Sequence, residues 1–342
     1  MKNFNDFKLT SKCPLLIAEI GGNHEGDFEY AKRLTKLALN TDVDFVKFQI
    51  YTASSIVAVN EDPDRHKHFK KFELTNSQHI ELAKMVTESG KIYISSVWDL
   101  NAIDWIDPYM PVYKIGSGDL TAYPVIKKIA QIAKPIILSI GLSTEEEAVD
   151  AIKYIQRINP IYKEKENLAV LQCTSMYPIT YADANLKIIT RIKKLTNLTV
   201  GYSDHTEGIV ALKYAYAMGA EIMEFHFTDD KNNTTFRDHK ISLNNEDIKE
   251  LLEEIDLINK LKGLEIKKPE EIEINNGHHI TFRRGIYPNR DIEVGEYITE
   301  ENISVLRPNH GIDAREFESI IGKKSITNLK AYEKINKKWL ID

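Results

Sequence analysis

The chain has 342 residues, which at about 150 residues per domain indicates roughly two domains, or one barrel of about 250 residues with a smaller attachment. Its 42% hydrophobic and 28% charged residues exclude a disordered or low-complexity chain. The formal net charge of −6 disfavours a nucleic-acid partner, because nucleic-acid-binding surfaces are usually basic.

The two cysteines, Cys13 and Cys173, are too few for a disulfide framework or a cysteine zinc site, and such sparse cysteine is typical of a reducing cytosol. The first apolar run ends at Glu19 and is too short for the core of a signal peptide. No stretch approaches the roughly 20 apolar residues that span a bilayer. We therefore expect a cytoplasmic protein without a membrane partner.

Short apolar runs alternate with segments of helical spacing over the first 227 residues. Near-continuous apolar runs are typical of strands buried on both faces of a parallel sheet. A helix is expected after Thr144, where three glutamates and an apolar stripe follow a capping residue. The eight predicted strands are residues 15–21, 43–49, 92–97, 112–116, 136–140, 168–174, 198–204 and 221–227.

Eight strands alternating with helices predict an α/β fold, a (β/α)8 TIM barrel that closes near Gly263. The alternative is a doubly wound open sheet, which usually carries a G-x-G-x-x-G segment after an early strand. Residues 21–26 read GGNHEG and lack that spacing. We expect a catalytic barrel over residues 1–263, a polar linker over 264–279 and a small, mostly β module over 280–342, where short apolar runs alternate with turn signals.

Polar side chains stand at the predicted strand ends, where a barrel builds its active site. Buried charged groups are costly without a partner or a ligand, so the set as a whole predicts a site. From the first strand to the eighth, these residues are Glu19, Asn23, His24, Lys47, Gln49, Ser95, Ser96, Lys114, Ser117, Asp119, Ser139, Gln172, Thr174, Tyr177, Ser203, Asp204, His205, Glu224 and His226.

The chemistry of this set points to anions and a metal. Lys47 and Lys114, with several serine hydroxyls, suit a phosphate and a carboxylate. His205 and His226 follow adjacent strands and could hold a divalent metal such as Mn²⁺ or, less typically, Zn²⁺; the alternative is two unrelated core histidines. Candidate carboxylates for base work or metal support are Glu19, Asp204, Glu224 and Asp238. These residues predict a metal-assisted barrel enzyme without identifying its reaction.

The order of the motifs resembles the sialic acid synthase family, which condenses phosphoenolpyruvate with an N-acylated amino sugar. The tail, from residue 283 to residue 323, resembles the antifreeze-like (SAF) domain of that family, so the resemblance covers essentially the whole chain. The barrel motifs are IAEIG (17–21), NHEGD (23–27), VKFQ (46–49), YKIGSG (113–118), ILS (137–139), CT (173–174) with YP (177–178), GYSDHT (201–206) and Glu224 with HFT (226–228).

The resemblance implies a role for each matching residue. His205 and His226 would hold the metal, and Glu19, Lys47 and Lys114 would be catalytic, with Glu19 beside the attacking water. Phosphoenolpyruvate would be bound through its phosphate by Lys114, Ser117, Ser139 and Ser203, and through its carboxylate by Lys47 and Ser96. The sugar would contact Gln49, Asp119, Tyr177, Asp238 and, from the tail of a second chain, Arg307, which implies a domain-swapped homodimer.

Departures from the family pattern leave the sugar open. Asp119 stands where many members have Glu, Phe225 where a basic residue is frequent, and TTFRD (234–238) where Gly-Pro-Asp is usual. N-acetylmannosamine, its 6-phosphate, and the diacetamido sugars that lead to legionaminic or pseudaminic acid all remain candidates. Two other functions also stay open: a barrel that makes a 3-deoxy sugar acid phosphate, and a non-catalytic protein that binds through its tail.

Overall fold

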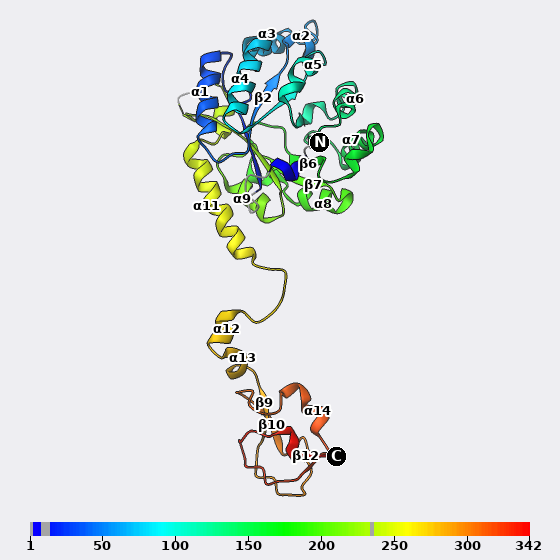
Figure 1. Cartoon of the computed structure of the whole chain (residues 1–342), viewed down its shortest axis with the longest axis vertical. Helices are drawn as coiled ribbons and strands as arrows, with labels where there is room; N and C mark the ends of the chain where they lie inside the picture. Colours follow the sequence, from blue (N-terminus) through cyan, green and yellow to red (C-terminus); the bar gives the residue numbers. More distant parts are fainter. Residues whose placement is uncertain (1–2, 8–13, 233–235) are drawn as a thin grey trace. The chain divides into compact units, whose positions relative to one another are not determined.

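The computed structural model describes residues 3–7, 14–232 and 236–342; Cys13, Thr234 and Thr235 lie outside these residues. The chain divides into two compact units, residues 1–263 and 264–342 (Figure 1). None of the described helices combines the length and the apolar character needed to cross a bilayer.

The first unit is a closed barrel of parallel strands in sequence order, which confirms the TIM barrel and excludes the open sheet. All the predicted strands are present, with slightly shifted ends. They are β1 (Leu15–Glu19), β2 (Phe45–Ile50), β3 (Ile92–Val97), β4 (Tyr113–Ile115), β5 (Ile136–Ser139), β6 (Leu168–Cys173), β7 (Thr199–Ser203) and β8 (Ile222–His226).

Helices surround the barrel, as Figure 1 shows, and cover the outer faces of its strands. The predicted start of α7 is confirmed, because the side chain of Thr144 accepts a hydrogen bond from the backbone N–H of Glu147 in a capping box. The main helices are α1 (Phe28–Leu39), α4 (Asn76–Glu88), α6 (Tyr123–Ile132), α7 (Glu145–Ile158), α8 (Lys187–Thr196), α9 (Val210–Ala217) and α11 (Asn245–Lys262). Shorter helices are α2 (Ala53–Ile56), α3 (Pro63–Phe72), α5 (Ala102–Ile106) and α10 (Asp238–Ile241).

The two-residue period of the strands separates core residues from site residues. On β2, Val46 and Phe48 pack in the apolar core, and Phe48 stacks on Tyr93 of β3 with ring centroids 5.6 Å apart. Lys47 and Gln49 alternate with them and line a cavity on the inside of the barrel. The apolar core therefore fixes which side chains reach the site.

The first strand ends earlier than predicted. It stops at Glu19, and Gly21 adopts a φ of +51°, a conformation that favours glycine. A Cβ atom on Gly21 would lie 3.0 Å from Oε1 of Glu19. The turn thus passes close to the Glu19 carboxylate, where a larger residue would crowd it.

The second unit has its own small apolar core, which includes Ile286, Ile298, Ile312 and Ile335. The predicted β character is present in two antiparallel pairs, β9 (Gly285–Pro288) with β10 (Ile303–Leu306), and β11 (Lys324–Ser325) with β12 (Leu340–Ile341). Short helices accompany them: α12 (Glu271–Asn275), which lies within the predicted linker, α13 (His278–Thr281) and α14 (Phe317–Ile320).

Gly201 on β7 lies close to the neighbouring strand β8 and tests how tightly the barrel wall is packed. A Cβ atom there would lie 2.2 Å from the carbonyl oxygen of Ile222 and 2.4 Å from Cδ2 of Leu171. We expect Gly201→Ala to lower the free energy of unfolding by about 1–3 kcal/mol through overpacking, measured by urea denaturation. Gly118→Ala is the control, because no atom lies within 4 Å of its added Cβ. Equal stability of the two variants would contradict the expected clash.

Candidate active site

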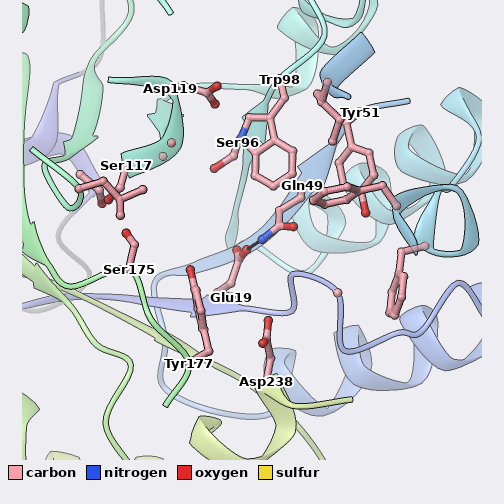
Figure 2. Close-up of a pocket in the computed structure, with 18 of the residues that line it drawn as sticks. Glu19, Gln49, Tyr51, Ser96, Trp98, Ser117, Asp119, Ser175, Tyr177 and Asp238 are labelled. Carbon is pink, nitrogen blue, oxygen red and sulfur yellow. Dashed lines mark hydrogen bonds between the residues drawn. The ribbon is translucent and has the colours of Figure 1, made fainter. Parts of the chain in front are cut away.

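A large cavity of about 1280 Å³ opens at the carboxyl ends of the barrel strands (Figure 2). Every residue of the first unit to which the resemblance gives a role lines it: Glu19, Lys47, Gln49, Ser96, Lys114, Ser117, Asp119, Ser139, Tyr177, Ser203, His205, His226 and Asp238. The topology of the barrel therefore gathers residues that are spread over more than 200 positions of sequence. Arg307 belongs to the second unit, where its guanidinium lies 5.5 Å from the ring centroid of Phe282.

The inner end of the cavity holds a buried cluster of charges, the charged floor, made of Glu19, Lys47, Lys114 and Glu224. Each of these residues is at most 6% exposed. Nζ of Lys47 lies 2.7 Å from Oε2 of Glu19 and 3.8 Å from Oε1 of Glu224. Nζ of Lys114 lies 3.7 Å from the same Glu224 oxygen and donates to Oγ of Ser139 at 2.7 Å. Two ammonium groups thus share two carboxylates away from water.

The charged floor shifts the pKa values of its members in different directions. Burial by itself lowers the pKa of Lys47, but the carboxylates of Glu19 and Glu224 outweigh it and hold this pKa above its ordinary value. Lys114 is less well compensated, so burial leaves its pKa below the ordinary value. Burial would raise the pKa of Glu224, yet Lys114 and Lys47 lower it to about 2. Of the two buried lysines, Lys114 is therefore the one whose charge a bound anion would stabilise more.

Hydroxyl groups surround Lys114 on the side of β4 and β5. The N–H of Gly141 donates to Oγ of Ser117 at 3.0 Å. A Cβ atom on Gly141 would lie 2.5 Å from Oγ of Ser175 and 2.8 Å from Oγ of Ser117, so only glycine fits between them. Sequence reasoning missed Gly141 and Ser175; each directly follows a predicted strand or its end motif. This cradle of hydroxyls beside a buried ammonium suits a phosphate.

The two predicted metal ligands lie together in the cavity. The ring centroids of His205 and His226 are 5.5 Å apart. His205 donates its Nδ1–H to the carbonyl oxygen of Thr174 at 2.7 Å, which leaves the lone pair on Nε2. Nδ1 of His226 is buried without a hydrogen-bond partner among the described residues, 3.8 Å from Oδ2 of Asp238. Burial lowers the pKa of His226 to about 4, so its imidazole is neutral, as a metal ligand must be.

These two imidazoles fit a divalent cation that takes its other ligands from water or substrate. Within the described parts of the chain, no group of three or more His, Cys, Asp or Glu side chains is placed to hold a metal.

Polar groups beside the histidines can meet a hydroxylated ligand. The Gln49 amide donates to Oε1 of Glu19 at 2.8 Å, and the ring of Tyr177 lies 4.0 Å from that of His205, between centroids. Asp119 and Asp238 approach the same space from other sides, as Figure 2 shows. Burial raises the pKa of Asp119 to about 6, although Lys114 opposes this shift.

Some polar residues at strand ends serve the fold instead. Asp204, a candidate carboxylate for base work or metal support, accepts hydrogen bonds from the backbone and hydroxyl of Thr206 and does not line the cavity, which argues against direct base work. Asn23 donates to the carbonyl oxygen of Phe227, and Ser95 donates to that of Phe48. These bonds join neighbouring strand ends and satisfy buried polar groups.

Sequence reasoning also missed the aromatic side of the cavity, formed by residues such as Tyr51, Phe69, Trp98 and Phe236. They come from loops and from α3, where a pattern of aromatic residues carries no signal of a common cavity. Phe225, singled out as a departure that bears on the sugar, lies in the barrel core and does not line the cavity. It points away from the cavity because it alternates with Glu224 and His226.

Comparison with known proteins agrees with this geometry. Residues 34–267 match the NeuB family, and residues 283–335 match the SAF domain. The N,N'-diacetyllegionaminic acid synthase of Campylobacter jejuni is 34% identical over 337 residues, which cover 95% of this chain and 99% of that protein. The human N-acetylneuraminate-9-phosphate synthase is 28% identical over 333 residues, 92% of this chain and 89% of that protein.

Among solved structures, an N-acetylneuraminic acid synthetase from Leptospira borgpetersenii superposes with a TM-score of 0.71 at 26% identity. The superposition covers 78% of this chain and 91% of that one. The likeness thus extends over most of the chain.

Asp119 provides a test of the electrostatics of the cavity. The pKa of Asp119 is about 6, above the ordinary 3.8, because the folded protein favours the neutral carboxyl group. The contribution of this group to the free energy of unfolding is therefore complete below pH 3.8 and is lost as the pH rises through 6. Asp119→Asn removes the cost of the buried charge. After allowance for solvent screening, we expect the substitution to be roughly 1 kcal/mol more stabilising at pH 7.5 than at pH 5, measured by urea denaturation. Asp150→Asn on the exposed side of α7 is the control; an equal pH dependence in both variants would contradict the prediction.

Proposed function

The chain belongs to the NeuB family, and we propose that it condenses phosphoenolpyruvate with an N-acylated hexosamine to a nine-carbon sugar acid, with release of phosphate. The observation that carries this proposal is the meeting of Lys47, Lys114 and their serines with two imidazoles in one cavity. An anion with two charged ends and a sugar aldehyde would find complementary groups side by side there.

The charged floor and the hydroxyl cradle would bind phosphoenolpyruvate. Lys114, Ser117, Ser139 and Ser203 would hold the phosphate, and Lys47 with Ser96 would hold the carboxylate. Ser203 is oriented by its hydrogen bond to Glu224 at 3.1 Å, and Ser139 by Lys114. These donors are in place before the ligand arrives, which lowers the entropic cost of binding.

In the proposed reaction, carbon 3 of phosphoenolpyruvate forms a bond to the aldehyde carbon, and a water oxygen adds at carbon 2. The bond between carbon 2 and the phosphate oxygen then breaks, and phosphate leaves. Glu19 stands where it can orient that water, since Lys47 and Gln49 hold both of its oxygens in position. Gln49, Asp119, Tyr177 and Asp238 would contact the sugar.

His205 and His226 would hold a divalent metal, which we propose to be Mn²⁺. When bound, the metal supplies Lewis-acid polarisation of the aldehyde oxygen. The hydrogen bond of His205 to Thr174 fixes which ring nitrogen faces the cavity, and Asp238 lies beside the other imidazole.

The other two functions are less well supported. The SAF domain match and the NeuB match together favour this family over barrels that make 3-deoxy sugar acid phosphates. A protein that only binds through its tail would not need the buried charges of the barrel, which are costly to maintain.

We propose that two chains exchange their second units, so that Arg307 of one reaches the sugar bound by the other. Large apolar side chains are exposed along residues 261–282: Leu261, Leu264, Ile266, Ile272 and Phe282. Exposed apolar side chains that gather in sequence can be covered by a partner. We place this homodimer in the cytoplasm, in agreement with the sparse cysteine.

The reaction is tested by phosphate release from phosphoenolpyruvate with Mn²⁺ and a panel of N-acylated hexosamines. We expect release only when a sugar is present, and a product mass equal to the sum of both substrates and water less phosphoric acid. We expect His226→Ala to weaken Mn²⁺ binding, measured by calorimetry, and to lower kcat by at least about 100-fold. His66→Ala, outside the cavity lining, is the control.

Two results would contradict this prediction. The reaction is wrong if no sugar of the panel releases phosphate. The metal assignment is wrong if His226→Ala keeps the calorimetric affinity of the unaltered protein for Mn²⁺.

Arg307 tests the exchange of the second unit. We expect Arg307→Ala to raise KM for the sugar about tenfold or more, with little change of KM for phosphoenolpyruvate, because a charged hydrogen bond to the acyl group is lost. Arg284→Ala, in the same unit, is the control. The chain should sediment as a dimer. A monomer with full activity, or equal effects of Arg307→Ala on both KM values, would refute the exchange.

A further inference from the structure

Side chains on β2 and β3 form successive layers from the floor of the cavity to its mouth. Lys47, Gln49 and Tyr51 face inward in alternation, and a rise of about 3.3 Å per residue separates each from the next by about 7 Å. On β3, Ser96 pairs with Gln49, and the N–H of Trp98, just beyond the strand, donates to the carbonyl oxygen of Ile50 at 3.0 Å. Tyr51 and Trp98 therefore lie one layer above the groups assigned to the substrates.

The upper layer is an aromatic wall formed by Tyr51, Phe69 and Trp98. The rings of Tyr51 and Trp98 stack with centroids 5.1 Å apart and an interplanar angle of 20°. Phe69 of α3 meets both rings edge-on, at 5.3 Å and 6.3 Å between centroids. These contacts hold the three rings in fixed positions. The wall is thus a preformed apolar surface above a charged floor.

Carboxylates border this wall at the mouth of the cavity. Glu61, Asp62 and Asp64 line the cavity at the start of α3. The carboxylate of Asp62 caps the helix by accepting from the backbone N–H of Arg65. The guanidinium of Arg65 lies over the ring of Phe69, 5.8 Å from its centroid, so this part of the lining has one guanidinium against three carboxylates. A dianionic group placed here would meet repulsion.

On the other side of the mouth, the positive charge belongs to Arg237, which already pairs with a carboxylate. The guanidinium of Arg237 pairs with Asp238 at 3.2 Å and lies 4.9 Å from the ring centroid of Tyr177. A phosphate bound here would compete with the buried Asp238 carboxylate for the charge of this guanidinium. Both sides of the mouth thus disfavour a second phosphate.

We propose that the aromatic wall receives the end of the amino sugar farthest from the reacting aldehyde, and that it selects an uncharged end carrying a methyl or a second acylamino group. The inference rests on the proposed function and adds to it the class of sugar: neutral and apolar at its far end, not phosphorylated. Aromatic faces favour methyl and acyl groups, whereas the acidic border rejects a phosphate.

The first test compares three sugars in the phosphate-release assay with phosphoenolpyruvate and Mn²⁺. They are N-acetylmannosamine, its 6-phosphate and a 2,4-diacetamido-2,4,6-trideoxyhexose. We expect kcat/KM to be highest for the trideoxy sugar and at least about tenfold lower for the phosphorylated one, since an unmatched charge costs more than a methylene group. A preference for the 6-phosphate would overturn the proposal.

The second test alters the wall. We expect Trp98→Ala to raise KM for the trideoxy sugar about tenfold or more, with kcat and KM for phosphoenolpyruvate nearly unchanged. Trp98→Phe, which keeps an aromatic face, should retain most of the affinity. If Trp98→Ala lowers kcat/KM for all three sugars by the same factor, the wall does not select among them and the proposal fails.

The third test alters the acidic border. The double variant Glu61→Gln with Asp64→Asn should raise kcat/KM for the 6-phosphate several-fold relative to the neutral sugars, and the gain should shrink in high salt. Glu146→Gln with Asp150→Asn on α7 is the matched control, with the same change of net charge outside the cavity. An equal gain in both double variants would refute the border as the cause of the gain.

The outcomes of the three tests also separate this proposal from the proposed function. Turnover of none of the three sugars would refute the proposed function. Turnover without any effect of these variants would refute only the role of the wall and its border.

Discussion

The structure depends on the sharing of charge among Glu19, Lys47, Lys114 and Glu224 inside the barrel. Each charge alone would be expensive to bury, and removing one partner leaves the others uncompensated. The cluster exists because β1, β2, β4 and β8 bring their ends to one level. Pairing of Glu19 with Lys47 on β2 and with His226 on β8 sets this level through the register of the strands. The register of an otherwise apolar barrel therefore decides whether the site forms.

The two lysines of the charged floor do not share the two carboxylates equally, and this inequality favours the binding of an anion. Lys47 has two carboxylates within 4 Å, whereas Lys114 has one and shares it with Lys47. The pKa of Lys114 is accordingly lowered while that of Lys47 is raised. An arriving phosphate would supply the charge that Lys114 lacks. Neutralising the buried ammonium of Lys114 would therefore contribute to the affinity for the anion, a common arrangement in active sites.

The groups assigned to the reaction and the groups assigned to the choice of sugar lie at different depths of the cavity. The charged floor and the two imidazoles lie where the strands end, so they are held by the rigid barrel. The aromatic wall and its acidic border come from the segment between β2 and α4 and from the residue after β3. Loops of this kind can change without disturbing the barrel. This division explains how one family can keep a reaction while its members accept different sugars.

Sequence alone determined the barrel and most of the site, because two-residue alternation and polar residues such as Lys47 and His226 at strand ends follow directly from parallel strands buried on both faces. It could not separate Asp204, which serves the fold, from Glu224, which joins the charged floor, since both are carboxylates in the carboxyl-terminal part of a predicted strand. Only the tertiary structure decided this, and only it brought Phe69 of α3 onto Tyr51 and Trp98. Such contacts depend on how loops pack, and no periodicity along the chain encodes them.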